Sequence, residues 1–129
     1  MSEVDAIRRV IEDRVRALRD KDAAAAVAML DADIVAFEVA GPLQVPAAQA
    51  TDVAATQAWL DSFDGPPEVE IEELAIHADG SVAFCHSLNR LSGVMADGRK
   101  IDLRMRSTLG LRKVGGAWKI VHAHTSVPR

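Results

Sequence analysis

The segment Trp118-Lys-Ile-Val-His-Ala-His-Thr-Ser-Val-Pro128 alternates in the manner of a β-strand that ends at a proline. Successive side chains on a strand point to opposite faces of a sheet. One face is therefore predicted to carry Trp118, Ile120, His122, His124 and Ser126. That face begins as apolar core and ends with two imidazoles and a hydroxyl. Groups that transfer protons at the rim of an apolar wall are typical of a small-molecule pocket.

Three pairs of turn residues precede this strand, at Asp79-Gly80, Asp97-Gly98 and Gly115-Gly116. Each pair is flanked by alternating sequence, which is a strong local signal for a β-hairpin. Strands are therefore predicted over residues 68–77, 82–95, 100–113 and 118–127, joined as an antiparallel meander. In the first strand the apolar alternation changes phase at Glu72-Glu73, which predicts a β-bulge that curls the sheet.

The register of the meander follows if Asp97-Gly98 and Gly115-Gly116 are two-residue loops. The face that packs on the helices is then predicted to carry Phe84, His86, Leu88, Arg90, Leu103, Met105, Ser107, Leu109, Leu111, Trp118, Ile120, His122, His124 and Ser126. The outer face is predicted to carry Cys85, Ser87, Asn89, Arg104, Arg106, Thr108, Ala123 and Thr125. A bulge in either long strand would move Asn89 and Arg106 inward, so both remain candidate site residues.

The first half of the chain is predicted to be mainly helical. Ser2 can cap a first helix with one apolar stripe, formed by Val4, Ile7, Ile11, Val15 and Leu18. Its arginines are interpreted as a solvated face: Arg8, Arg9, Arg14 and Arg16. Asp22 can cap a short second helix that ends near Leu30. A strand over residues 34–40 stops at Gly41-Pro42, and Thr51 can cap a third helix that carries Trp59 and Phe63 and ends at Gly65-Pro66-Pro67.

The bulk composition indicates an ordinary globular domain. The chain has 129 residues, 49% of them hydrophobic and 26% charged, which predicts one domain over residues 1–129. The formal net charge of -4 and the lack of a basic block argue against a nucleic-acid partner. No membrane association is expected, since no apolar run is long enough to span a bilayer. No secretory signal is expected, because Met1–Asp5 lacks a basic segment followed by an apolar one, and the single cysteine, Cys85, favours a cytoplasmic location.

Four stretches carry a family resemblance: Phe37-Glu-Val-Ala-Gly-Pro-Leu43, His86-Ser-Leu-Asn-Arg-Leu-Ser-Gly93, Arg106-Ser-Thr108 and Trp118–Pro128. With the order helix, helix, strand, helix and four-strand meander, they resemble the SnoaL-like family of ketosteroid isomerase homologues within the NTF2-like superfamily. The resemblance covers essentially the whole chain. It implies an α+β cone, in which N-terminal helices pack on a strongly curved, mainly antiparallel sheet.

The resemblance also implies a small hydrophobic carbonyl compound inside the cone and acid–base chemistry of the isomerase, cyclase or dehydratase type. Catalytic members of the family place a carboxylate base on the first strand, where this chain has Glu38. His86 or His124 would be the proton donor. The remaining candidates would bind the substrate: His122, Arg90, Asn89, Ser107, Arg106, Ser126 and Trp59. Steroid isomerisation itself is not expected, because the chain lacks the tyrosine that donates to the oxyanion in ketosteroid isomerase.

Two alternatives stay open at this point, so the assignment as an enzyme is not fixed. The same fold could serve as a non-catalytic module that binds a ligand or associates as a dimer. Three histidines with Glu38 could instead hold a metal, since a His-x-His strand with a third imidazole is a known ligand pattern. The leading hypothesis needs no cofactor or metal. A homodimer formed through the outer face of the sheet is expected from the family resemblance.

Overall fold

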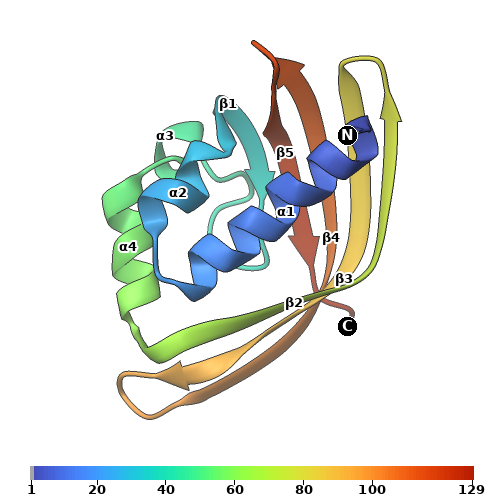
Figure 1. Ribbon diagram of the computed structural model, residues 1–129. Coiled ribbons are helices and arrows are strands. Elements are labelled where there is room, and N and C mark those ends of the chain that lie inside the picture. The colour runs from blue at the N-terminus through green and yellow to red at the C-terminus, as the bar shows by residue number, and fades with distance from the viewer. Residues whose placement is uncertain (1) are drawn as a thin grey trace.

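The computed structural model describes residues 2–129. Helices α1 (Glu3–Arg19) and α2 (Ala23–Ala28) come first, followed by strand β1 (Leu30–Phe37) and helices α3 (Ala47–Ala50) and α4 (Val53–Asp61). Strands β2 (Phe63–Asp79), β3 (Val82–Met95), β4 (Lys100–Val114) and β5 (Ala117–Ser126) complete the structure. The helices lie over one face of an open, curved five-stranded sheet (Figure 1), which confirms the predicted α+β cone.

The sheet has the strand order β1-β5-β4-β3-β2. The four strands from β2 to β5 form the predicted antiparallel meander, and β1 adds to its edge by pairing in parallel with β5. The predicted bulge in β2 is confirmed, because the register shifts between Glu72 and Ala75. Glu73 there adopts a positive φ of 52°, and the long strands β2 and β3 curl toward the helices (Figure 1).

Helix α1 is fixed across the concave face of the sheet at several points. Ser2 caps it as predicted, since its Oγ accepts a hydrogen bond from the backbone nitrogen of Asp5 at 3.0 Å. Ile7 and Ile11 are buried against the sheet. The Glu3 carboxylate accepts hydrogen bonds from Trp118 Nε1 and Lys113 Nζ, both at 2.9 Å, and the bond from Lys113 is the main cause that lowers the pKa of Glu3.

Several predicted element boundaries are wrong by a few residues. Asp52, not Thr51, caps α4, with its carboxylate accepting from the backbone nitrogen of Ala55. Phe63 begins β2 instead of belonging to a helix, and residues 65–67 lie within that strand. The first strand spans Leu30–Phe37 and therefore begins and ends earlier than 34–40. Helix α3 has no counterpart in the prediction.

The β3–β4 loop has three residues, which corrects the predicted register. Met95 donates to the carbonyl of Arg99 at 2.7 Å, and Gly98 donates to the carbonyl of Met95 at 2.9 Å. The loop is therefore Ala96-Asp97-Gly98, with Gly98 at φ 90°, a conformation that favours glycine. A one-residue change in a hairpin loop exchanges the two faces of a strand. The side chains of β3 are consequently inverted relative to the prediction.

A second correction concerns the end of β5. The Gly115-Gly116 loop has two residues as predicted, since Val114 pairs with Ala117, and the predicted pairing holds as far as Leu111 with Ile120. The register then shifts, so that Gly110 pairs with His122. This unpredicted bulge places the extra residue Val121 in β5 and inverts every side chain after it.

The core forms between α1, β1 and the middle of the sheet. Its most completely buried large side chains include Ile7, Leu111 and Ile120. Trp118 is also buried there, as predicted. Among residues 2–129, no helix combines the length and apolar character that crossing a membrane requires.

Candidate functional site

A cavity of about 490 Å³ lies between the helices and the concave face of the sheet. Its walls come from α1, α4, β1 and the segment after β1, and from all four strands of the meander. Most of the lining is apolar, for example Leu18, Met105 and Leu109. The volume lies in the range of small-molecule sites, and such sites combine apolar walls with a few polar groups.

Glu38 is one of two charged residues among the described residues that line this cavity. It follows β1 directly and continues the alternation of the buried residues Ile34 and Ala36, so its side chain turns to the same side. The backbone there is held by a hydrogen bond of 2.9 Å from Val45 to the carbonyl of Ala36. Glu38 is accessible to solvent, yet the partial desolvation of its carboxylate raises its pKa above 4.5.

Arg14 is the second charged residue of the lining. Its Nε is buried and has no hydrogen-bond partner among the described residues. Burial lowers the pKa of Arg14, and the charge of Glu38 partly opposes that change. Arg14 in turn limits the rise in the pKa of Glu38. The charge of each group therefore affects the pKa of the other, although no ion pair between them is found in residues 2–129.

The sheet contributes neutral polar side chains to the same cavity. Ser87 and Asn89 project from β3, and the Ser87 Oγ donates a hydrogen bond of 2.7 Å to Asn89 Oδ1. Ser107 on β4 is buried, and Thr125 on β5 lies beyond the bulge. Hydroxyls and amides can orient the polar end of a ligand whose body lies against apolar walls.

Four of the residues proposed from the sequence line the cavity: Glu38, Asn89, Ser107 and Trp59. Asn89 does so because the three-residue loop inverts β3. Trp59 lies on α4 and is 43% exposed, with its ring edge-on to Phe63 at a centroid distance of 5.2 Å. It is therefore positioned where the cavity opens to solvent.

The prediction that the histidines face the cavity is wrong. His86 is paired with Thr108, and both lie on the outer face because their neighbours Cys85, Ser87 and Ser107 face inward. His122 and His124 lie on the same outer face as a consequence of the β5 bulge. Arg106 pairs with Ser126, and both also project outward.

Arg90 is likewise on the outer face, where it is held by its neighbour across the strands. Its guanidinium donates two hydrogen bonds of 2.8 Å to the two carboxylate oxygens of Asp102. This bidentate contact raises the pKa of Arg90 and lowers that of Asp102. Arg90 is therefore not positioned to contact a substrate in the cavity, contrary to the prediction.

The outer face instead gathers all four histidines with aromatic partners. His77 stacks on Phe84 at a centroid distance of 4.6 Å, and His86 lies 5.5 Å from His77. Phe37 contacts His122 and His124 edge-on at 5.1 and 5.3 Å. Because Glu38 lies on the opposite side of the sheet, the proposed metal site of three histidines and Glu38 is not formed. Among residues 2–129, no group of three or more His, Cys, Asp or Glu side chains is arranged to hold a metal ion.

Cys85 was expected on the outer face, but it faces the cavity and is 1% exposed. Burial raises the pKa of its thiol to about 11. A thiol with such a pKa remains protonated near neutral pH and is a poor nucleophile. Cys85 therefore acts as an apolar part of the wall.

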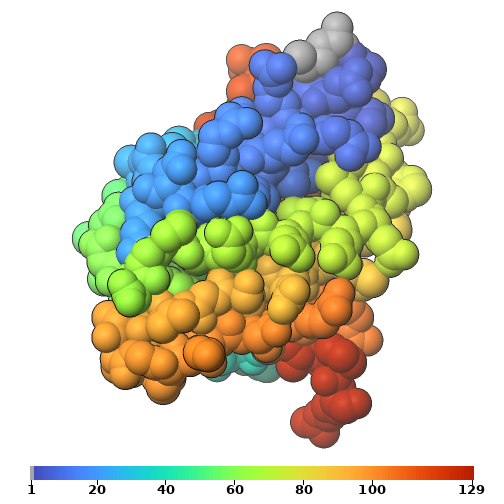
Figure 2. Space-filling view, turned by 60° about the horizontal axis from the view of Figure 1, so that its bottom comes forward, coloured from blue at the N-terminus to red at the C-terminus, as the bar shows by residue number. Residues whose placement is uncertain are grey.

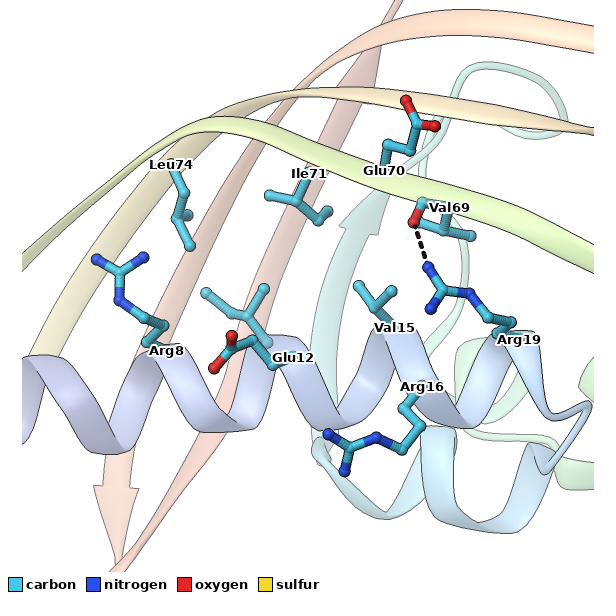
Figure 3. Close-up of a pocket in the computed structure, with 10 residues that line it drawn as sticks. Arg8, Glu12, Val15, Arg16, Arg19, Val69, Glu70, Ile71 and Leu74 are labelled. Atoms are coloured by element: carbon cyan, nitrogen blue, oxygen red, sulfur yellow. Dashed lines mark hydrogen bonds between the residues drawn. The ribbon is translucent and has the colours of Figure 1, made fainter.

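A second hollow of about 480 Å³ runs along the outside, between α1 and β2. Figure 2 shows β2 alongside α1 on this side of the molecule. Arg8 and Arg19 point toward β2, whereas Arg16 turns away from it (Figure 3). Arg19 donates to the carbonyl of Val69 at 3.3 Å and lies 3.7 Å from Glu68. We assign the functional site to the inner cavity, because these arginines are solvated, and Arg16 and Arg19 already have protein partners.

Arg14 is the charged site residue that the sequence interpretation missed, besides the neutral Ser87 and Thr125. It lies three residues after Ile11 and four before Leu18, in the middle of the apolar stripe of α1. A charged residue on the apolar stripe of a helix is a detectable signal for a functional position. Treating the arginines of α1 as one group concealed it.

Comparisons with known proteins agree with this architecture. A sequence model of the SnoaL-like domain matches residues 7–129. A crystal structure of an NTF2-like protein of unknown function from Pseudomonas putida KT2440 is 35% identical, with a TM-score of 0.81 over 99% of this chain and 89% of that one. No curated protein sequence matches the chain.

Two further solved structures resemble the chain. A protein from Shewanella frigidimarina NCIMB 400, described with the proposed role of a ketosteroid isomerase, is 26% identical, with a TM-score of 0.73 over 94% of both chains. A proposed scytalone dehydratase from Novosphingobium aromaticivorans DSM 12444 is 17% identical, with a TM-score of 0.81 over 98% of this chain and 85% of that one. At 17% identity, the similarity to the Novosphingobium protein is a similarity of fold alone.

Proposed function

The chain belongs to the SnoaL-like domain family of the NTF2-like superfamily, and on that premise we propose that it is a proton-transfer enzyme. Its substrate is a small, largely apolar carbonyl compound that binds in the inner cavity. The observation that carries the proposal is the position of Glu38, a carboxylate with a raised pKa at an apolar cavity. Such a carboxylate is a stronger base than one in water, which suits the removal of a proton from carbon.

Glu38 acts as the general base in this proposal. One of its carboxylate oxygens removes a proton from the carbon next to the carbonyl, and the electron pair of that C–H bond forms an enolate. The protonated Glu38 then returns the proton to another carbon, which isomerises the substrate without loss of atoms. Neutral donors in the cavity wall, such as Ser107 and Asn89, are available to the enolate oxygen. The histidines take no part, because the sheet separates them from the cavity.

Deuterium exchange tests the proposal without knowledge of the physiological substrate. The protein is incubated in D2O with a panel of cyclic ketones and β-keto compounds, and loss of the proton next to the carbonyl is followed by NMR. We expect exchange by the wild-type protein, reduced by about 10²-fold or more in Glu38→Gln, since a general base contributes roughly that factor. His124→Ala, a change on the outer face, serves as the matched control and retains exchange. Equal exchange by the wild-type and Glu38→Gln proteins would contradict the assignment.

We also propose a homodimer through the outer face of the sheet, the second function open to this fold. The residues that support it differ from those predicted, because Cys85, Ser87, Ala123 and Thr125 face the cavity. In their place the outer face exposes Phe84 at 52% and Leu88 at 45%, with His77 and His86 beside Phe84. Exposed large apolar side chains that lie together mark interaction surfaces.

Light scattering at micromolar concentration tests the dimer. The wild-type protein is expected to have the mass of two chains, and Phe84→Glu that of one, because it places a charge within the interface. A wild-type protein with the mass of one chain would refute the dimer.

The single cysteine leads us to propose a location in the reducing cytoplasm.

A further inference from the structure

Arg14 occupies a position that folding alone does not explain. The residues that share its stripe on α1, including Ile11 and Leu18, contact the apolar interior of the protein. An arginine there takes part of a permanent charge out of water, and its buried Nε has no partner among the described residues. A buried donor without a partner is destabilising, and more so when it is charged. Such a group in a native structure requires an explanation, and a bound ligand would supply one here.

Among residues 2–129, no carboxylate forms an ion pair with Arg14. Glu38 is the one acidic residue among the described residues of the cavity lining. Glu38 influences Arg14 through space, but the two form no ion pair in the part of the chain that the structure describes. The sheet opposite contributes the neutral groups Ser87, Asn89 and Ser107. The cavity therefore contains a cation that contacts no counter-charge among the described residues.

We propose that the substrate of this cavity is a carbonyl compound that carries a carboxylate, and that Arg14 binds this carboxylate. A guanidinium presents parallel N–H donors that match the two oxygens of a carboxylate, and the contact gains strength away from water. The apolar body of the ligand lies along Met105 and Leu109 toward Trp59, where the cavity opens. Its carbonyl group lies within reach of Glu38. The inference rests on the proposed function for the carbonyl group and its approach to Glu38, whereas the carboxylate site rests on the position of Arg14.

A pair of aromatic probes that differ only in charge tests the inference. Binding of 2-naphthoate and 2-naphthamide is measured by calorimetry near pH 7. The wild-type protein is expected to bind 2-naphthoate roughly tenfold or more tightly than 2-naphthamide. Arg14→Met removes that preference and leaves the affinity for 2-naphthamide within about twofold. Arg9→Met, an exposed arginine on the same helix, is the matched control and keeps the preference.

Two additions keep the test decisive if Arg14→Met fails to fold. Arg14→Lys retains the charge but loses the fork of donors, so it should bind 2-naphthoate with intermediate affinity. In the wild-type protein, the NMR signal of the Arg14 Nε–H group should shift when 2-naphthoate is added. Equal affinities of the wild-type protein for the two probes, binding of neither, or an unchanged preference in Arg14→Met would overturn the inference.

The binding and exchange experiments separate the two proposals. A protein that prefers 2-naphthoate through Arg14 but exchanges no proton loses the proposed enzymatic function and keeps the carboxylate site. A protein that exchanges protons equally on neutral ketones and on keto acids, with no preference for 2-naphthoate, keeps the enzymatic function and loses the carboxylate site.

Discussion

Replacing Arg14 with methionine should stabilise the ligand-free protein, although it removes a residue of the site. Methionine fills the space of the alkyl stem and has no donor to leave unpaired. An unpaired buried donor costs about 1–3 kcal/mol, and apolar replacement of buried ion pairs is often neutral or stabilising by about 1–4 kcal/mol. Part of the Arg14 side chain borders the cavity and retains some solvent contact, so the lower end applies. We expect the free energy of unfolding to rise by about 1 kcal/mol.

The gain can be measured by urea denaturation at neutral pH. For a chain of this size, about 1 kcal/mol corresponds to a rise of about 3–5 °C in Tm. Arg9→Met, on the exposed side of α1, should change the free energy of unfolding by no more than about 0.5 kcal/mol. A loss of more than about 1 kcal/mol in Arg14→Met would refute the reasoning, because it would mean that Arg14 has a stabilising protein partner in solution.

Three further predictions follow from the same structure. Glu38→Gln should be more stable than the wild type at neutral pH. Because the pKa of Glu38 is raised in the folded state, the wild-type protein loses stability as the pH rises from 4.5 through that folded-state pKa. Thermal melts from acidic to neutral pH should show that the difference in Tm between the two proteins vanishes in acid. Gly98→Ala should lose about 1–2 kcal/mol in urea denaturation, since φ of 90° disfavours alanine, and an unchanged midpoint would contradict the three-residue loop. His86→Ala and His124→Ala should bind 2-naphthoate as tightly as the wild type in calorimetry, whereas a large loss would place an imidazole in the cavity.

Apart from helix α3, the order of the elements was predicted from the sequence, because each element depended on local signals. The capping residue Ser2, the apolar stripe of α1 and the phase change at Glu72-Glu73 all have the structural meaning that their chemistry suggests. The base candidate Glu38 was identified through a family resemblance, and its position continues the alternation of β1. Each of these features can be recognised from the residues close to it in the sequence.

The predicted faces of β3 and of the end of β5 failed because they depended on single-residue differences. Asp97-Gly98 is compatible with loops of two or three residues, and the sequence does not distinguish them. The bulge near Val121 cannot be recognised in the sequence, because the alternation of side chains shows no change of phase there like the one at Glu72-Glu73. Each slip exchanges the faces of the strand. The histidines were consequently predicted inside, whereas Asn89 and Cys85 were predicted outside.

The most direct test of the shared cavity is an NMR titration of the Glu38 side-chain carboxyl in the wild-type and Arg14→Met proteins. We predict a pKa above 4.5 in the wild type and a higher one in Arg14→Met, because the variant keeps the desolvation of Glu38 and loses the opposing charge. An ordinary pKa of Glu38 in both proteins would mean that the carboxylate points into water and that the two groups do not share one apolar cavity.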